Sequence, residues 1–401
     1  MKNLLIRASK APFDNWCDGS IPTAQIRDVY KALAKDGTKN AGNLVFAHST
    51  YKALSAPDTT LTVDDYRLSG DDAFVDEADR LNERYDAFII PLCNSFRVSY
   101  GDSIARMTRT IRKLKIPCIV TGVGAQTSLT GSFDQLEPIR TEVYEFVSAI
   151  LDRSASISVR GEYTRDYLLS LGFGQDQVDV IGCPSMFYNG RRMAVSKKPG
   201  GLDKIALNLS NIAKPQLKQI TGYFNEHSKG VTFIPQVRLL MKEIYLNQLP
   251  LPGAPDLLKS PVPNLRRQGQ VKFFFDVMPW MDFMREQSFT VGTRIHGNVV
   301  SLLADTPAHV IAHDSRTLEL ARYFEIPHSI LTEMDGFDAQ DVYDRSDFTN
   351  LNANHGKRLD IYARFLEKNG LAHILYDDEK LAAHDARVRA SLTDARFREA
   401  A

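Results

Sequence analysis

Residues 288–307, SFTVGTRIHGNVVSLLADTP, decide the fold class of this chain. The apolar run SFTVG breaks into Thr-Arg-Ile-His-Gly-Asn, and apolar residues then recur with helical spacing. We expect SFTVG to be a central strand and GNVVSLLADTP to be a helix that Asn298 caps. A buried strand that leads directly into a helix is the building unit of α/β proteins with parallel sheets.

The same alternation of short apolar runs and amphipathic segments continues through the chain. Apolar residues recur every three or four positions in segments such as 103–115 and 138–153, so one face of each predicted helix can pack on a sheet. The predicted strands are residues 87–93, 116–122, 156–160 and 177–182 in the first half, and 204–210, 230–236, 271–276, 288–292 and 307–314 in the second. The pattern therefore predicts an α/β fold with two parallel sheets.

The length of 401 residues exceeds what one ordinary core organises, which favours two domains. We expect an N-terminal Rossmann-like domain at 1–190, a basic, Gly-rich linker at 188–204, a C-terminal Rossmann-like domain at 204–355 and a helical tail at 356–401. In the tail, Leu381, Val388, Leu392 and Ala395 share one helical face, which predicts packing on the body. Two such halves place a central cleft at the carboxyl ends of their sheets, where open α/β sheets bind ligands.

Composition excludes several classes of protein. The 49 basic residues balance the 49 acidic ones, so we expect no nucleic-acid partner. The N-terminus lacks the features of a signal peptide, and no run approaches the roughly 20 apolar residues of a membrane span. The four cysteines are scattered, and no metal-binding motif is present, so we expect a cytoplasmic protein without a metal site. Peripheral contact with a membrane stays open.

Arg294 and His296 follow the strand SFTVG, beside the free N–H groups of a helix N-terminus. Such a turn binds anions, and arginine adds a planar fork that matches carboxylate or phosphate. Histidine adds a proton that moves near neutral pH. The alternative is structural: Arg294 pairs with a nearby carboxylate, and His296 is a hydrogen-bonded core histidine.

Arg160 occupies the equivalent position in the first half, between the strand SISVR and the amphipathic helix that follows. Two arginines that face one cleft from two domains suit a small ligand with two anionic groups. The alternative for Arg160 is a salt bridge with Glu162 or Asp166 at the start of the helix.

Other strand ends give a predicted rim for the cleft. In a third junction, Asp314 or Ser315 caps a helix in which Arg316 and Glu319 lie one turn apart and can pair, so that a ligand role is the weaker interpretation. The segment GVGAQTS lacks the full dinucleotide-binding pattern but forms a tight turn that a ligand can approach. The predicted rim residues are Gly122, Gly124, Gln126, Asn94, Ser185, Asp314, Ser315 and Arg316.

The sequence resembles the polysaccharide pyruvyl transferase family at these residues. The strongest similarity lies in VGTRIHGNVVSLLADTPAHVIAHDSRTLELARYFEIP (291–327), and SVRGEYTRDYLLSLGF and IPCIVTGVGAQ resemble the corresponding segments of the first domain. The resemblance runs from residue 42 to residue 327. Residues 40–43 read Asn-Ala-Gly-Asn where relatives usually carry Asn-x-Gly-Asp, and the Pro-rich residues 235–268 lack an evident counterpart.

The resemblance implies a GT-B-like architecture and transfer of pyruvate from phosphoenolpyruvate, as co-substrate, to a sugar of a surface polysaccharide or its lipid-linked precursor. It implies no cofactor and no metal. His296 would be the catalytic acid, and Arg294 would stabilise the departing phosphate with Arg160. The predicted donor-binding residues are Arg160, Arg294, Ile295, His296, Gly297 and Asn298. A glycosyltransferase that uses a nucleotide sugar, or a non-catalytic carbohydrate-binding protein of the same fold, are the alternatives.

Overall fold

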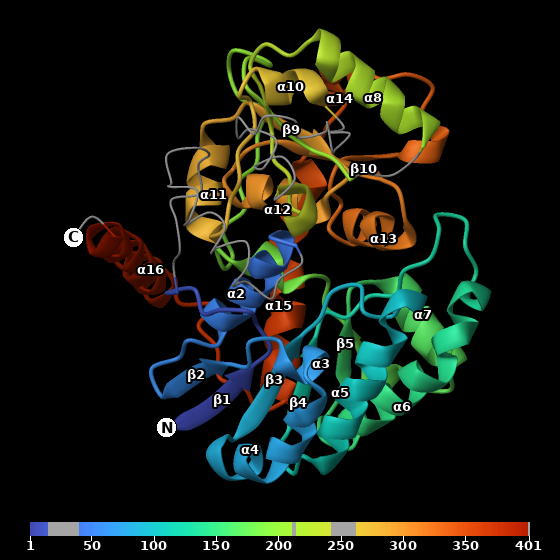
Figure 1. The fold of residues 1–401 in the computed structure, drawn as a ribbon, viewed down its shortest axis with the longest axis vertical. Helices are drawn as coiled ribbons and strands as arrows, with labels where there is room; N and C mark the ends of the chain where they lie inside the picture. The colour runs from blue at the N-terminus through green and yellow to red at the C-terminus, as the bar shows by residue number, and fades with distance from the viewer. Residues whose placement is uncertain (15–39, 211–213, 242–261, 400–401) are drawn as a thin grey trace, which may run out of the picture.

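A computed structural model gives the fold, and it describes residues 1–14, 40–210, 214–241 and 262–399, with side chains up to residue 392. The chain forms two lobes, one above the other in Figure 1, and each lobe contains a parallel sheet. Part of the Pro-rich segment and Ala395 of the predicted apolar face lie outside what is described. Within these ranges, no helix is both long and apolar enough to cross a membrane.

The lower lobe contains the first sheet, in the order β2-β1-β3-β4 with all strands parallel. Beside it lies a parallel pair, β5 and β6, which a bridge between Val123 and Val159 connects to the end of β4. All four strands predicted in the first half are present, whereas β1 and β2 were not predicted. The bounds are β1 Lys2–Ile6, β2 Thr59–Val63, β3 Ala87–Pro91, β4 Cys118–Thr121, β5 Ile157–Val159 and β6 Val178–Val180.

Helices of the lower lobe pack beside this sheet, and α2 is buried on almost every side. In α5, the buried residues Ile104, Met107 and Ile111 recur every three or four positions, as the sequence predicts. The helices are α2 Gly42–Ala53, α3 Arg67–Gly70, α4 Ala78–Arg84, α5 Gly101–Lys113, α6 Arg140–Leu151 and α7 Glu162–Ser170.

The upper lobe contains the second parallel sheet, in the order β11-β10-β9-β7-β8. Its strands are β7 Ile205–Asn208, β8 Val231–Phe233, β9 Phe289–Gly292, β10 Ala308–Ala312 and β11 His328–Ile330. Its helices are α8 Pro215–Glu226, α10 Pro263–Arg267, α11 Val277–Arg285, α12 Ile295–Leu303, α13 Ser315–Tyr323 and α14 Ala339–Asp344.

Two local predictions are wrong in this lobe. Residues 271–276 form only an isolated bridge, between Val271 and Phe233, because their run of buried phenylalanines has no periodicity that separates a strand from other buried chain. Asn298 lies inside α12, whose N-cap is Arg294. Its side-chain amide donates to the Gly292 and Arg294 carbonyls at 3.1 Å each, so it connects the helix to the preceding turn.

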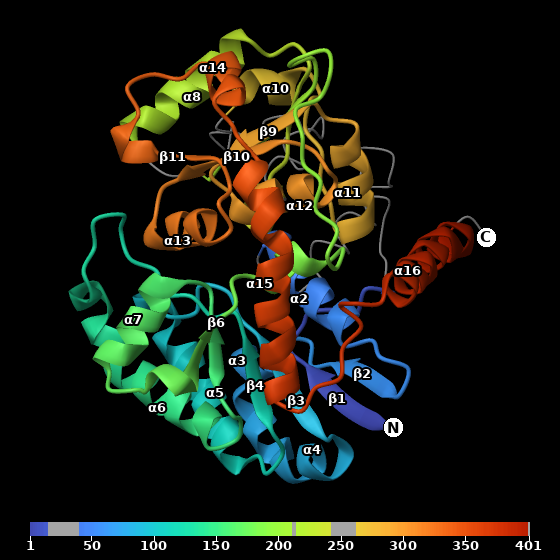
Figure 2. The ribbon, with the colours of Figure 1, turned by 180° about the vertical axis from the view of Figure 1, so that it is seen from behind.

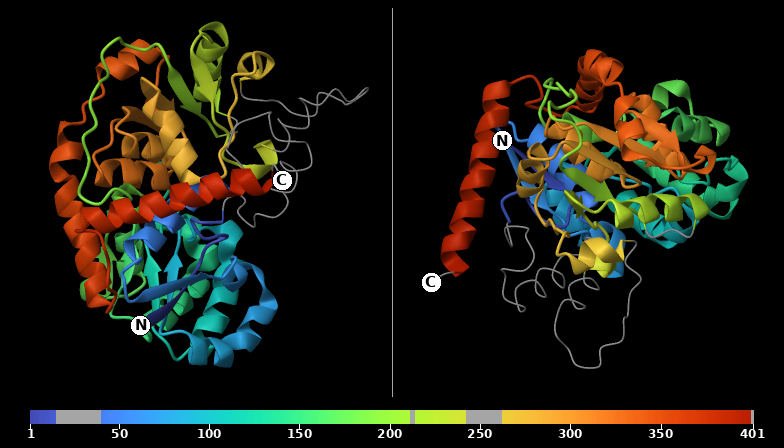
Figure 3. Two further views of the ribbon diagram at one scale, coloured as in Figure 1. Left: turned by 90° about the vertical axis from the view of Figure 1, so that its left-hand side faces the viewer. Right: turned by 90° about the horizontal axis from the view of Figure 1, so that it is seen from above.

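The last two helices connect the lobes. Figure 2 shows α15 (Thr349–Lys368) descending from the upper lobe along the lower one. Figure 3 shows α16 (Asp378–Glu399) crossing the side of the molecule. Leu381 and Val388 of α16 are buried, as the helical pattern of the tail predicts, and Asp385 pairs with Lys52 of α2 at 2.7 Å. The structure is thus an α/β fold of two Rossmann-like, parallel-sheet lobes in a GT-B-like arrangement.

Candidate active site

The strand-to-helix turn at 292–295 is fixed by Asn208, the last residue of β7. The Asn208 carbonyl accepts the Thr293 N–H at 2.8 Å, and its side-chain Oδ1 accepts the Arg294 N–H at 2.9 Å. A Cβ at Gly292 would lie 1.9 Å from the Asn208 carbonyl oxygen, so the turn requires glycine there. The sequence thereby holds Arg294 at the carboxyl end of β9.

The first turn of α12 is packed closely against the neighbouring strand ends. A Cβ at Gly297 would lie 2.5 Å from Gln236 Nε2 and 2.9 Å from Asn208 Nδ2, so these two amides approach the helix only because residue 297 is glycine. Ile295 is buried in the core as well. Gly297, Ile295 and Asn298 of the predicted donor-binding set therefore support the turn that presents Arg294 and His296.

His296 is 4% exposed and reaches into the lower lobe. Its ring lies 5.6 Å from the Phe46 ring, and its Nε2 lies 3.6 Å from the thiol sulfur of Cys183. Burial, together with the positive charges of Arg160 and Arg316, lowers the pKa of His296 well below its usual value. Without a bound anion, the imidazole is therefore neutral at physiological pH.

Arg160 is fully buried at the carboxyl end of β5. Its Nε donates to the Gly122 carbonyl at 2.7 Å and its Nη2 to the Leu92 carbonyl at 3.2 Å, whereas Nη1 has no hydrogen-bond partner. The alternative was a salt bridge of Arg160 with Glu162 or Asp166. The described part of the chain contains neither pair, and Asp166 pairs with Arg165 instead. Arg160 therefore holds a buried positive charge with one nitrogen uncommitted.

Asp314 and Arg316 form the third junction. Asp314 caps α13, as predicted, and its Oδ1 accepts the Thr317 N–H at 2.8 Å. Arg316 Nη2 lies 3.3 Å from Asp314 Oδ2. Arg316 therefore pairs with Asp314 rather than with Glu319, whose carboxylate instead accepts hydrogen bonds from Thr164 of the lower lobe.

Several predicted rim residues meet across the two lobes. Asn94 donates to the side chain of Gln126, and Gln126 Nε2 donates to Asp314 Oδ2 at 3.0 Å. The Ser315 hydroxyl accepts the Thr127 N–H at 2.9 Å, and the Ser315 N–H donates to the Thr127 carbonyl at 3.2 Å. The carboxyl ends of both sheets are therefore joined directly beside the arginines.

The other predicted rim residues lie behind the arginines. Gly122 has a φ of +69°, which favours glycine, and its carbonyl accepts from Arg160. A Cβ at Gly124 would lie 3.1 Å from Arg160 Cδ. Ser185 is fully buried and donates to Cys183 at 2.9 Å, so it contributes to the packing under His296.

Two residues of this region were not singled out in the sequence. Cys93 and Arg97 follow β3, and both interact electrostatically with Arg316. Arg97 also donates to the carbonyl of the rim residue Asn94. The sequence does contain a signal for Arg97. It follows a predicted strand, as Arg160 follows β5 and Arg294 follows β9.

The region has an excess of positive charge. Arg97, Arg160, Arg294 and Arg316 interact with one another or with shared neighbours. Of the carboxylates nearby, Asp314 pairs with Arg316, and Glu319 interacts electrostatically with Arg160. Burial and the charge of Arg316 lower the pKa of Arg294 to about 10, and its Nε has no hydrogen-bond partner. An anion bound in this region would offset the repulsion between the guanidinium groups and accept hydrogen bonds from their unpaired N–H groups.

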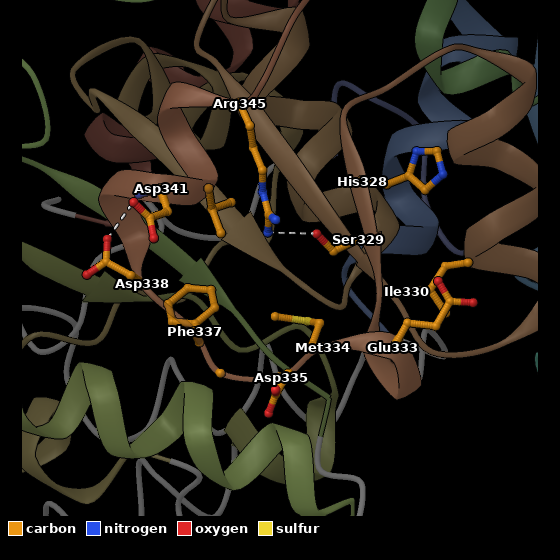
Figure 4. A pocket seen from close by; sticks show the side chains of 12 residues that line it. His328, Ser329, Ile330, Glu333, Met334, Asp335, Phe337, Asp338, Asp341 and Arg345 are labelled. Atoms are coloured by element: carbon orange, nitrogen blue, oxygen red, sulfur yellow. Dashed lines mark hydrogen bonds between the residues drawn. The ribbon is translucent and has the colours of Figure 1, made fainter.

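Two hollows open in the described part of the molecule, one next to the arginine cluster and one apart from it. One of about 490 Å³ opens between α7 and α13, and Ser315 and Glu319 are among its lining residues. Another, of about 670 Å³, lies beside β11 and α14 and shares no lining residue with the arginine cluster. Figure 4 shows the side chains of this second hollow, where Arg345 donates a hydrogen bond to Ser329. Its negative charge comes from four carboxylates: Glu333, Asp335, Asp338 and Asp341.

Solved structures similar to this chain include two complexes with UDP. UDP-GlcNAc 2-epimerase from Methanocaldococcus jannaschii, in complex with UDP-GlcNAc and UDP, is 13% identical, with a TM-score of 0.47 and coverage of 92% of this chain and 99% of that chain. HepE from Anabaena, in complex with UDP and glucose, is 10% identical, with a TM-score of 0.40 and full coverage of both chains. No curated protein matches the sequence.

The family comparison agrees with the residues that form the site. The family model of polysaccharide pyruvyl transferase matches residues 40–315, which extend from the loop before α2 to the first residue of α13. This range includes Cys93, Arg160, Arg294 and His296 and covers more than half of the chain. The chain therefore belongs to the polysaccharide pyruvyl transferase family.

Proposed function

We propose that the protein transfers the enolpyruvyl group of phosphoenolpyruvate to two hydroxyl groups of one sugar, as a ketal, and releases phosphate. The observation that carries the proposal is a set of three guanidinium groups beside His296: Arg160, fully buried in the lower lobe, and Arg294 and Arg316, partly buried in the upper one. Phosphoenolpyruvate carries a carboxylate and a phosphate on a small enol, and guanidinium groups pair with both through charge-assisted hydrogen bonds.

Arg160 and Arg294 have the features that donor binding requires. Each is largely buried and each has a guanidinium nitrogen without a hydrogen-bond partner, Nη1 in Arg160 and Nε in Arg294. Binding of the donor would pair these nitrogens and neutralise the charge repulsion. In the transition state the same groups would stabilise the negative charge of the departing phosphate.

His296 is our candidate for the acid. Its imidazole is neutral in the unliganded site, because burial and two guanidinium charges lower its pKa. The negative charge of the bound donor offsets Arg160 and Arg316, so the imidazole gains a proton when the donor binds. That proton goes to the methylene carbon while a sugar hydroxyl attacks the adjacent carbon. The C–O bond to phosphate then breaks, and the proton of the first hydroxyl leaves with the phosphate. A second hydroxyl of the sugar attacks the same carbon and closes the ketal, and its proton returns to the imidazole.

The acceptor is proposed from family membership: a sugar of a surface polysaccharide or of its lipid-linked precursor. A lipid-linked acceptor would place the reaction in the cytoplasm at the inner face of the membrane, where phosphoenolpyruvate is available.

The direct test is incubation with phosphoenolpyruvate and a panel of synthetic α- and β-hexosides, followed by mass measurement and a phosphate assay. The expected result is a mass gain of one pyruvyl ketal with release of one phosphate per product. Thermal shifts with phosphoenolpyruvate and with a panel of nucleotide sugars provide a second measurement. Stabilisation by a nucleotide sugar alone would contradict the proposal and favour glycosyl transfer.

A further inference from the structure

Cys93 differs from the other described cysteines in its exposure. Cys118 and Cys183 are 0% and 1% exposed, whereas Cys93, two residues after the end of β3, is partly exposed. The residue before it, Leu92, accepts a hydrogen bond from Arg160 through its carbonyl. The Cys93 side chain itself interacts with the guanidinium groups of Arg160 and Arg316, so the thiol belongs to the arginine cluster.

The charges around Cys93 favour the thiolate. Burial by itself would raise the pKa of the thiol, but the guanidinium groups of Arg160 and Arg316, with Arg97, outweigh this effect and lower the pKa of Cys93. The thiolate is the nucleophilic form of cysteine, and thiols next to arginine are more reactive than isolated ones.

A second observation, unpaired guanidinium nitrogens, points to an anionic ligand beside this sulfur. Arg160 is 0% exposed, and its Nη1 has no hydrogen-bond partner, although its guanidinium group interacts electrostatically with Cys93. Arg316 also has a buried nitrogen, Nε, without a partner. Two guanidinium nitrogens next to the thiol therefore form no hydrogen bond within the described part of the protein.

We propose that Cys93 is a covalent modification site for small electrophiles that carry an anionic group, with 2-haloacetates as the simplest members. The carboxylate of the reagent binds the guanidinium groups of Arg160 and Arg316, and this places its CH₂ carbon near the sulfur. The thiolate sulfur forms a bond to that carbon, the carbon–halogen bond breaks, and halide leaves with its electron pair. No oxidant or reductant takes part.

The modification closes the proposed donor site. The attached carboxymethyl group keeps its carboxylate among the guanidinium groups, in the place that we assign to an anionic group of phosphoenolpyruvate. This consequence rests on the proposed function, whereas the steering of the reagent rests only on the arginine cluster.

The test compares iodoacetate with iodoacetamide, which has the same leaving group and no charge. Cys17 lies outside the described residues, so the full-length Cys17→Ser variant is used, and peptide masses assign each label. The quantity compared is the ratio of the labelling rate with iodoacetate to the rate with iodoacetamide. We expect this ratio to be about tenfold or more higher at Cys93 than for N-acetylcysteine, and we expect added salt to lower it. Equal relative rates, or labels on other residues, would overturn the inference.

The Arg316→Gln variant checks the cause, because it removes one guanidinium group and leaves the thiol. We expect the preference for iodoacetate at Cys93 to fall in this variant, and an unchanged preference would contradict steering by Arg316. Phosphoenolpyruvate should slow the labelling of Cys93 in the parent protein. Steered labelling without such protection would support the modification site and contradict the proposed donor.

Discussion

At the scale of single residues, Arg160 is the clearest case of a buried charge that no salt bridge within the described parts of the chain neutralises. It is fully buried, forms no salt bridge within the described parts of the chain, and donates only to two carbonyls. Burying an unpaired charge has a high cost in free energy, which proteins accept mainly where a ligand supplies the opposite charge.

Arg160→Met is expected to raise the KM for phosphoenolpyruvate about tenfold or more, since a hydrogen bond to a charged group contributes roughly 1.5–3 kcal/mol. Phosphate-release kinetics measure the effect. Arg165→Met is the matched control, because Arg165 lies on the outer side of α7 and pairs with Asp166. Circular dichroism confirms that both variants fold, and an unchanged KM in a folded Arg160→Met variant would contradict the donor-binding role.

His296 gives a prediction about protons. Donor binding should raise its lowered pKa, so the wild-type protein should take up more protons on binding phosphoenolpyruvate near neutral pH than His296→Gln does. Calorimetric titrations in buffers of different ionisation enthalpy measure the difference. Phosphate release should be abolished in His296→Gln. Near-normal turnover in this variant would show that His296 is not the acid.

At the scale of elements, the turn between β9 and α12 depends on two glycines that allow strand ends to approach closely. Gly292 lies against Asn208, and Gly297 lies against Gln236 and Asn208. The function of these glycines is local packing, and through packing they fix the direction of Arg294.

Gly297→Ala should destabilise the protein by roughly 1–3 kcal/mol, because the new methyl group would lie 2.5 Å from Gln236 Nε2. Gly222→Ala in α8 is the matched control: a Cβ there has no neighbour within 4 Å, so the substitution should stabilise the helix by up to about 1 kcal/mol. Chemical denaturation of both variants measures the free energy of unfolding. Equal effects of the two substitutions would contradict the packing argument.

At the scale of the whole molecule, Glu319 connects the two lobes. Its carboxylate accepts the Thr164 N–H at 2.7 Å and the Thr164 hydroxyl at 3.0 Å, and a Cβ at Gly161 would lie 2.3 Å from Glu319 Cγ. Thr164 in turn accepts the N–H of Ala125 at the end of β4. A chain of hydrogen bonds therefore runs from one sheet through α7 to α13 of the other lobe.

Burial raises the pKa of Glu319 from 4.5 to about 7. A raised folded-state pKa means that the contribution of Glu319 to stability is fully present below about pH 4.5 and is lost as the pH rises through about 7, a change on the order of 3 kcal/mol. Glu319→Gln, which stays neutral, should lack this loss. The free energy of unfolding of both proteins, measured between about pH 5 and pH 8, tests the prediction.

Glu325→Gln is the control for this pH dependence. The pKa of Glu325 is lowered, chiefly by its hydrogen bond with Arg358, so its carboxylate stabilises the fold across this whole pH range. Glu325→Gln should therefore shift the free energy of unfolding by a nearly constant amount. A wild-type protein that differs from Glu319→Gln by a constant amount as well would contradict the link to Glu319.

The sequence by itself determined the α/β class, most of the strands of both sheets and the three arginine-bearing junctions, because these follow from local hydrophobic spacing and from residue types at strand ends. It missed β1, β2 and β11 and misassigned residues 271–276, whose local pattern is ambiguous. Only the tertiary structure decided that Arg316 pairs with Asp314, that Glu319 reaches Thr164, and that Cys93 and Arg97 join the cluster. The Glu319–Thr164 contact and the interactions of Cys93 and Arg97 with Arg316 connect residues far apart in the chain, and they exist only because two parallel sheets bring their carboxyl ends together.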